Sequence, residues 1–262
     1  MFKSLWANRE LIKTSAKREV LGRYRGSFLG LMWSLFNPVL MLTVYTFVFS
    51  TVFKARWGTG SDSKTEFALV LFAGLIVFNI FSDCVNRAPS LILGNPNYVK
   101  KVLYPLEVLP LISLIASLYH ASISMAVWFV AYFFLQGLPH TTVLFLPLIL
   151  APFCMLVLGI SWILSALGVF LRDVSQFVSV VTTVLMFLSP IFYPTDILPE
   201  TYRNLLQLNP LTTVIESVRD VIYWGKVPKV TTLIVYWIIS ILVAWTGFAL
   251  FQKTRKGFSD VL

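Results

Sequence analysis

Six long apolar runs constrain this chain more than any other feature of its sequence. They cover residues 31–53, 67–87, 108–135, 143–171, 174–193 and 231–251. Each has about the length of roughly 20 residues that a helix needs to cross some 30 Å of hydrocarbon. Only 13% of the residues are charged, well below the share of about 25% in soluble domains. We therefore expect an all-α integral membrane protein with six transmembrane helices, forming one domain over 1–262.

The distribution of lysine and arginine predicts the orientation of these helices. With the N-terminus inside, the cytoplasmic segments hold fourteen of the 21 basic residues and the outer loops hold seven. Because positive charge is retained on the cytoplasmic side, both termini are predicted to be cytoplasmic. No short apolar core with a small-residue cleavage site precedes the first run, so we expect no removable signal peptide. The net charge of +9 is thus a topology signal with some attraction to anionic lipid, and it does not indicate nucleic-acid binding.

The N-terminal segment, residues 1–30, is predicted to hold an amphipathic helix. Within residues 5–25, apolar side chains fall near one helical face and basic side chains cover much of the rest; the apolar set is Leu5, Ile12, Ala16 and Val20. This pattern is typical of a helix that lies in the membrane interface. Gly22, Gly26 and Gly30 follow at intervals of four and predict close packing of another helix, with a flexible hinge as the alternative.

Two short helices are predicted between the fifth and sixth runs, at 199–207 and 210–224. Asn209 can cap the second, and Pro210 suits its first position. Its apolar residues recur at helical spacing, at Leu211, Val214, Ile215, Val218, Val221 and Ile222, and its polar residues fall opposite, at Thr212, Glu216, Arg219 and Asp220. A helix of this size is too short to span, so we expect re-entrant helices that dip into the outer leaflet. An ordinary surface helix packed on the outer loops is the alternative.

The sequence lacks the residues of common enzymes. The stretch GTGSDSKT, Gly58–Thr65, departs from a phosphate-binding loop where Ser63 replaces a glycine, and G-x-S-x-G, H-E-x-x-H and C-x-x-C are absent. Cys84 and Cys154 fall inside predicted spans, so we expect no disulfide framework. The two histidines are isolated, so we expect no metal site. Asp83 and Arg87, four residues apart, are predicted to neutralise each other. We therefore expect no catalytic, cofactor-binding or metal site, and a transporter driven by an external motor.

The segment LGNPNYVKKVLYPLEVLP, Leu93–Pro110, is unlike the apolar runs on either side of it. Pro96 and Pro105 frame a piece that can form a helix, and this piece lies on the predicted cytoplasmic side. Tyr98, Lys101 and Tyr104 are residues of the kind that anchor protein interfaces. We predict a docking helix for a groove in another protein; the alternative is a basic loop that only sets topology.

Four stretches together resemble one family. In order, they are REVLGRYRGSFLGLMWSLFNPVLMLTVYTFVF, NYVKKVLYPLEVLP, ALGVFLRDVSQFV and FLSPIFYP. Together they are similar to the membrane subunit of type-2 ABC exporters, in particular the permeases for O-antigen, capsular polysaccharide and teichoic acid. The resemblance runs from about Leu5 to Leu262. It implies a homodimer in the bacterial inner (plasma) membrane that exports a lipid-linked polysaccharide from the cytoplasm. It also implies two copies of a separate ABC ATPase subunit, which would bind ATP and Mg²⁺.

The resemblance also implies roles for particular residues. The segment matching Asn95–Glu107 would be the coupling helix that fits a cleft on the ATPase, through Asn95, Tyr98, Lys100, Lys101, Tyr104 and Glu107. The interface helix would include Arg18, Arg23, Tyr24 and Arg25, and the short helices within 199–224 would be outer gate elements. The first and fifth spans of the two subunits would enclose the substrate path. Aromatic side chains at helical spacing or near the outer ends of these spans are the candidate lining, namely Tyr45, Phe49, Phe53, Phe187, Phe192 and Tyr193; ordinary packing or an aromatic belt is the alternative.

Two other functions remain open at this point. The same scaffold could export a small lipid or drug. From a different class, a membrane-embedded acyl- or glycosyltransferase would use His120 or Asp83 as a base.

Overall fold

The computed structural model describes residues 6–23, 25–48, 57, 64–100 and 104–261, and within these residues every regular element is helical. The longer helices are α3 (Trp33–Phe47), α4 (Lys64–Arg87), α6 (Val108–Gln136), α7 (Leu146–Phe170), α8 (Val174–Leu188) and α11 (Val230–Thr254). The others are α2 (Arg9–Gly22), α5 (Pro96–Lys100), α9 (Glu200–Gln207), α10 (Pro210–Ile222) and α12 (Phe258–Val261), with 3-10 turns η1 (Gly30–Met32), η3 (Ala88–Ser90), η4 (Thr141–Phe145), η5 (Thr195–Ile197) and η6 (Arg255–Gly257). Several residues discussed above lie outside the described part of the chain, namely Leu5, Tyr24, Phe49, Phe53, Lys101 and 58–63 of the stretch GTGSDSKT.

Five helical segments are long and apolar enough to cross a membrane. They are Gly30–Phe47, Thr65–Ser90, Val108–Gln136, Thr141–Phe170 and Val230–Gly257. The all-α membrane fold is thereby confirmed, but the predicted fifth span at 174–193 is not a full-length span. Its helix α8 has 15 residues, which is about 22 Å. It ends because Pro190 disfavours helical backbone at Ser189, which is extended.

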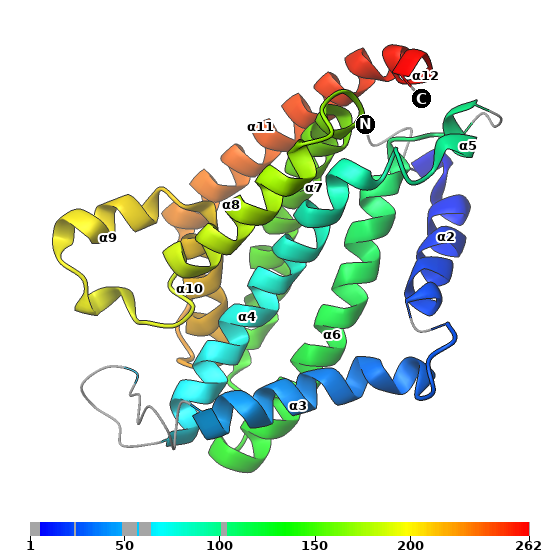
Figure 1. Ribbon diagram of the computed structural model, residues 1–262. Coiled ribbons are helices and arrows are strands. Elements are labelled where there is room, and N and C mark those ends of the chain that lie inside the picture. Colours follow the sequence, from blue (N-terminus) through cyan, green and yellow to red (C-terminus); the bar gives the residue numbers. More distant parts are fainter. Residues whose placement is uncertain (1–5, 24, 49–56, 58–63, 101–103, 262) are drawn as a thin grey trace.

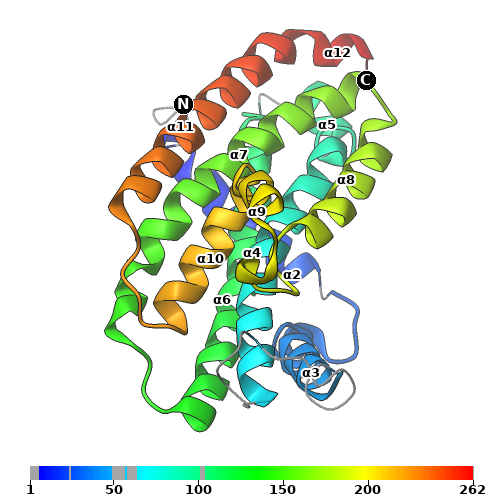
Figure 2. The same cartoon turned by 90° about the vertical axis from the view of Figure 1, so that its left-hand side faces the viewer.

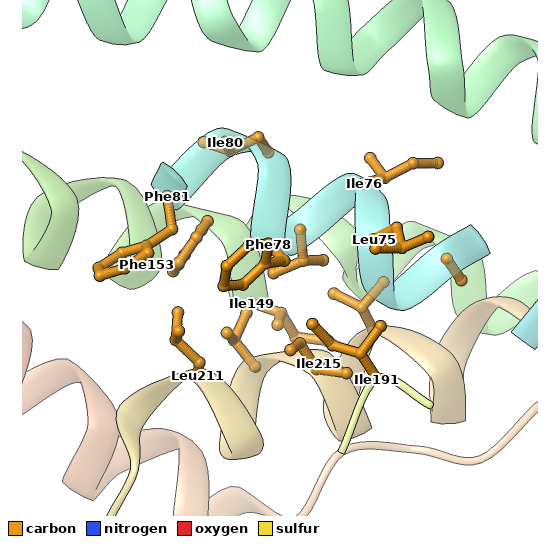
Figure 3. Packing of buried hydrophobic residues seen from close by; sticks show 14 of the residues in the cluster. Leu75, Ile76, Phe78, Ile80, Phe81, Ile149, Phe153, Ile191, Leu211 and Ile215 are labelled. Carbon is orange, nitrogen blue, oxygen red and sulfur yellow. The ribbon is translucent and has the colours of Figure 1, made fainter. Parts of the chain in front are cut away.

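Helix α4 forms the centre of the bundle. In the apolar stretch of α4 that is able to cross a membrane, 83% of the residues are buried inside the protein, compared with 22% for α11 and 11% for α3. It packs against α3, α6, α7, α8 and α10, and Figures 1 and 2 show these helices around it. Figure 3 shows the main core, where Phe78 and Phe81 of α4 lie with Phe153 of α7 and Ile215 of α10. α3 and α8 lie on the same side of α4 in Figure 2, and both keep large exposed apolar faces.

Helix α10 confirms the predicted cap and apolar stripe. Asn209 Oδ1 accepts a hydrogen bond from the Leu211 amide at 3.0 Å, and Pro210 occupies the first helical position. All six apolar residues of the stripe are buried in the main core, and Figure 3 labels two of them, Leu211 and Ile215. The predicted polar face was wrong for Thr212 and Arg219, which are only 1% and 3% exposed. Arg219 lies four residues after Ile215 and three before Ile222, and so it falls within the buried stripe.

Helix α2 also forms as predicted, with Ile12, Ala16 and Val20 buried. The expected close packing on the three following glycines is wrong. A methyl group at Gly22, Gly26 or Gly30 would meet no atom within 4 Å. Gly26 and Gly30 instead have φ values of +86° and +51°, a left-handed conformation that glycine adopts without strain. These glycines therefore serve the turn between α2 and α3.

Candidate functional site

The segment 95–107 begins with α5 and is held to α2 by a pair of tyrosines. The Tyr98 and Tyr104 rings stack with centroids 4.3 Å apart and an interplanar angle of 8°. Arg18 Nη2 of α2 donates a hydrogen bond to the Tyr98 hydroxyl at 2.7 Å. This bond raises the pKa of Arg18 above its ordinary value, and burial raises the pKa of Tyr104. A displacement of this segment would therefore be transmitted directly to α2.

The other end of the segment is fixed to α7 and to the C-terminal end of α11. Glu107 Oε2 pairs with Arg255 Nη1 at 2.9 Å, and Arg255 Nη2 also donates to the Tyr104 carbonyl at 3.2 Å. The Glu107 carbonyl accepts a bond from the buried Trp162 indole at 2.9 Å. Tyr104 and Leu106 belong to an apolar cluster that also contains Ile12 of α2 and Phe258 of α12. The segment is thus bonded to three elements that are far apart in the sequence (Figure 1).

The structure changes the interpretation of the predicted anchor residues. Tyr104 is 8% exposed, so its ring packs inside this chain and supports the segment rather than projecting from it. Asn95 is half-buried and donates to the Leu91 carbonyl at 2.9 Å. Asn97 is exposed on α5, whereas the side chain of Lys100 and all of Lys101 lie outside the described residues. The docking surface thus stays a prediction, and the stacked tyrosines are the residues that hold this segment in place.

The predicted local pair of Asp83 and Arg87 is wrong, because both side chains pair with the α2 region. Arg23, directly after α2, pairs with Asp83, and Glu19 of α2 pairs with Arg87. Each of the four side chains is about one-third exposed. Arg25, the remaining described residue of the predicted interface set, is exposed. Two ion pairs therefore tie the end of α2 to the last turns of α4.

A polar cavity lies beside these ion pairs, among α3, α4 and α6. It has a volume of about 480 Å³, and Asp83 and His120 both line it, together with Asn37 and Ser124. The structure thus brings together the two residues that a transferase would use. Within the described residues, no cluster of three or more His, Cys, Asp or Glu side chains could hold a metal ion.

At the opposite end of the bundle, three of the predicted lining aromatics come together. Phe187 of α8 stacks on Phe192 with ring centroids 5.8 Å apart, and the Tyr193 hydroxyl donates to the Phe187 carbonyl at 3.1 Å. Phe187 is 60% exposed, and its helix α8 lies on the same side of α4 as α3 in Figure 2. Tyr45 of α3 is instead half-buried and packs against the core. The Phe187 ring is thus stacked on Phe192 on one side and exposed on the other.

Sequence reasoning missed Arg255 and the role of Arg219. Arg255 is 148 residues from Glu107, and no local pattern indicates that pair. Arg219 carried a usable signal, since its spacing from Ile215 and Ile222 places a charge on the buried face. A charge at such a position has to find several acceptors within the fold.

Comparisons with known proteins place the chain in a transporter family. The family model described as ABC-2 type transporter matches residues 10–223. The chain is similar to the O-antigen export system permease protein RfbA of Myxococcus xanthus, 28% identical over 262 residues, which cover 99% of this chain and 98% of the relative. RfbA of Klebsiella pneumoniae is 27% identical over 255 residues, covering 97% and 95% of the two chains. The polysialic acid transport protein KpsM of Escherichia coli is 24% identical over 242 residues, covering 91% of each.

Proposed function

The chain belongs to the ABC-2 type transporter family, and from this membership we propose that it is the membrane subunit of an exporter for a lipid-linked polysaccharide. A separate ABC ATPase would bind ATP and Mg²⁺ and drive export across the bacterial plasma membrane. Two copies of the chain would pair with two ATPase subunits, with all termini in the cytoplasm.

One observation carries this proposal. The similarity to RfbA of Myxococcus xanthus extends over 99% of this chain and 98% of the relative, so it includes every helix described above. RfbA is named for O-antigen export, and KpsM is named for polysialic acid transport. A small lipid or drug as substrate has no comparable support.

The contacts of segment 95–107 support a route from ATPase to membrane helices. Closure of the ATPase pair would push α5, and the bonds from Tyr98 to Arg18 and from Glu107 to Arg255 would carry the movement to α2 and α11. The ion pairs from Arg23 and Glu19 would pass it on to α4. This is a rigid-body transition through elements held by side-chain contacts.

The apolar faces of α3 and α8 support the location of the path. They pack on the same side of α4, and large side chains such as Phe36, Phe177 and Phe187 are exposed on them. Exposed apolar faces in a membrane protein meet either lipid or another subunit. In the proposed dimer, they would face the second copy and separate when the lipid-linked chain passes.

The test is deletion of the gene followed by complementation. We expect loss of surface polysaccharide and accumulation of the lipid-linked glycan inside the cell, restored by the wild-type gene. K100E/K101E should abolish rescue and association with the ATPase. The control K253E/K256E makes the same charge change at the same end of the bundle and should retain both. An unchanged surface polysaccharide in the deletion strain would refute the proposal, and full export by D83N/H120A would remove the transferase alternative.

A further inference from the structure

A second polar cavity lies at the end of the bundle opposite α5. It has a volume of about 540 Å³ and is bounded by α10 and the link between α8 and α9. We name it the outer pocket and define it by three aromatic residues and three acidic ones, namely Trp57, Tyr193, Trp224, Asp196, Glu216 and Asp220. None of these six was part of the coupling or ion-pair contacts described above. A cavity of this size accommodates one or two sugar rings.

The floor of the outer pocket is rigid. Arg219 donates to the carbonyls of Val70 and Ile191, at 2.8 Å each, and to that of Pro190. Its guanidinium lies 4.5 Å from the centre of the Trp57 ring. Because Arg219 is bonded in three directions, it holds Trp57 and the 190–191 backbone in one geometry. Such preorganisation lowers the entropic cost of binding a ligand.

The aromatic residues of the outer pocket can contact a sugar through its C–H faces. Trp224 keeps 36% of its surface exposed, and Tyr193 is partly exposed and oriented by its bond to the Phe187 carbonyl. Aromatic rings combine a large apolar face with low conformational entropy, so they suit a ligand that is apolar on its faces and polar at its edges.

The acidic residues complement the edges of such a ligand. Glu216 Oε1 accepts a bond from Thr195 Oγ1 at 2.7 Å, which orients this carboxylate. Asp220 lies 3.6 Å from Lys226 Nζ in an exposed pair. Ionised carboxylates accept hydrogen bonds from hydroxyl and ammonium groups. Among the described lining residues, three carboxylates meet two cations, so a neutral or amino sugar is favoured over an acidic one.

From this arrangement we propose that the outer pocket binds a neutral or amino sugar residue of the exported glycan. The proposal rests on the proposed function and adds a holding site for the chain on the outer side. Stacking on Trp224 and hydrogen bonds to Glu216 and Asp220 make the contact. Binding there retains the part of the glycan that has already crossed, and so opposes backward sliding.

The test measures glycan binding to the purified full-length permease in detergent. The probe is the polysaccharide released by mild acid from the cells that carry the gene, with polysialic acid as an acidic comparison. We expect saturable binding by calorimetry, and binding of polysialic acid at least about tenfold weaker. W224A and E216Q should each weaken binding about tenfold, the loss of one good contact.

Matched controls separate the pocket from the rest of the surface. W245A removes an exposed tryptophan of α11, and E200Q neutralises an exposed glutamate of α9; neither residue lines the outer pocket. Both should bind like the wild type, and W224F should retain most of the affinity. Absence of binding by the wild type, equal binding by W224A and E216Q, or preference for polysialic acid would each overturn the proposal. If the wild-type gene restores export in the deletion strain while these binding results fail, only the outer pocket is refuted.

Discussion

Gly159 of α7 and Gly247 of α11 meet backbone to backbone. A methyl group at Gly247 would overlap the Gly159 carbonyl, and one at Gly159 would lie 2.5 Å from the Val243 carbonyl oxygen. Small residues at such a crossing let two helices approach closely where no hydrophobic effect drives them together in lipid. The contact explains why α11, mostly exposed along its length, stays joined to α7, whose other face packs against α4.

Alanine at Gly247 should destabilise the protein. The added methyl group has only main-chain atoms to displace, and we expect a loss of about 1–3 kcal/mol, the usual cost of overpacking. Thermal unfolding in detergent measures the effect. G22A is the control, since nothing lies within 4 Å of a methyl group there; equal stability of G247A and G22A would contradict the close crossing.

Replacing Arg219 should be more costly. R219M would leave buried carbonyls of Val70, Pro190 and Ile191 without their donor, and each such group costs about 1–3 kcal/mol. We expect little folded protein in the membrane fraction, measured by size-exclusion chromatography of the detergent-solubilised protein. R203M removes a less buried arginine from the same region and should have a smaller effect. Normal levels of R219M would show that the carbonyls find other partners.

The pair of Glu107 and Arg255 should matter for both stability and coupling. Glu107 is 5% exposed and Arg255 36%, so R255M leaves a mostly buried carboxylate without its partner at a cost of about 1–3 kcal/mol. R255K keeps the charge and should recover part of the loss. Export and thermal stability are measured together, with R172M as an exposed control near the same end. Unaltered export in R255M would exclude this pair from the coupling route.

Breaking the pair of Arg23 and Asp83 should release the end of α2 from α4. Because both side chains are about one-third exposed, we expect breaking the pair to lower the free energy of unfolding by only about 0.2–1 kcal/mol. A clearer readout is limited tryptic cleavage at Lys13 and Lys17, which should be faster in R23D and in D83R. The double variant R23D/D83R restores opposite charges and should slow cleavage again, and R25D is the control. No rescue in the double variant would argue against a direct pair.

The sequence predicted the elements well where one local pattern determines them. The apolar runs located five spans, and Asn209, Pro210 and the stripe from Leu211 to Ile222 predicted α10. It failed where a residue had a choice of partner: Asp83 and Arg87 suit each other by spacing, yet each bonds to the α2 region instead. The tyrosines of segment 95–107 were recognised as special, but their role inside the chain was not, because Arg18, which bonds to Tyr98, lies 80 residues away in the sequence.

The sequence alone determined that this chain lies in a membrane, which segments are helical, and which family it resembles. The reason is that placing peptide groups and charges in hydrocarbon is so unfavourable that length and apolarity of a run decide the matter locally. Only the tertiary structure decided that α4 is central, that Arg219 forms the floor of the outer pocket, and that Glu107 pairs with Arg255. Those contacts depend on the distances between side chains far apart in the chain, which are set by how the helices pack.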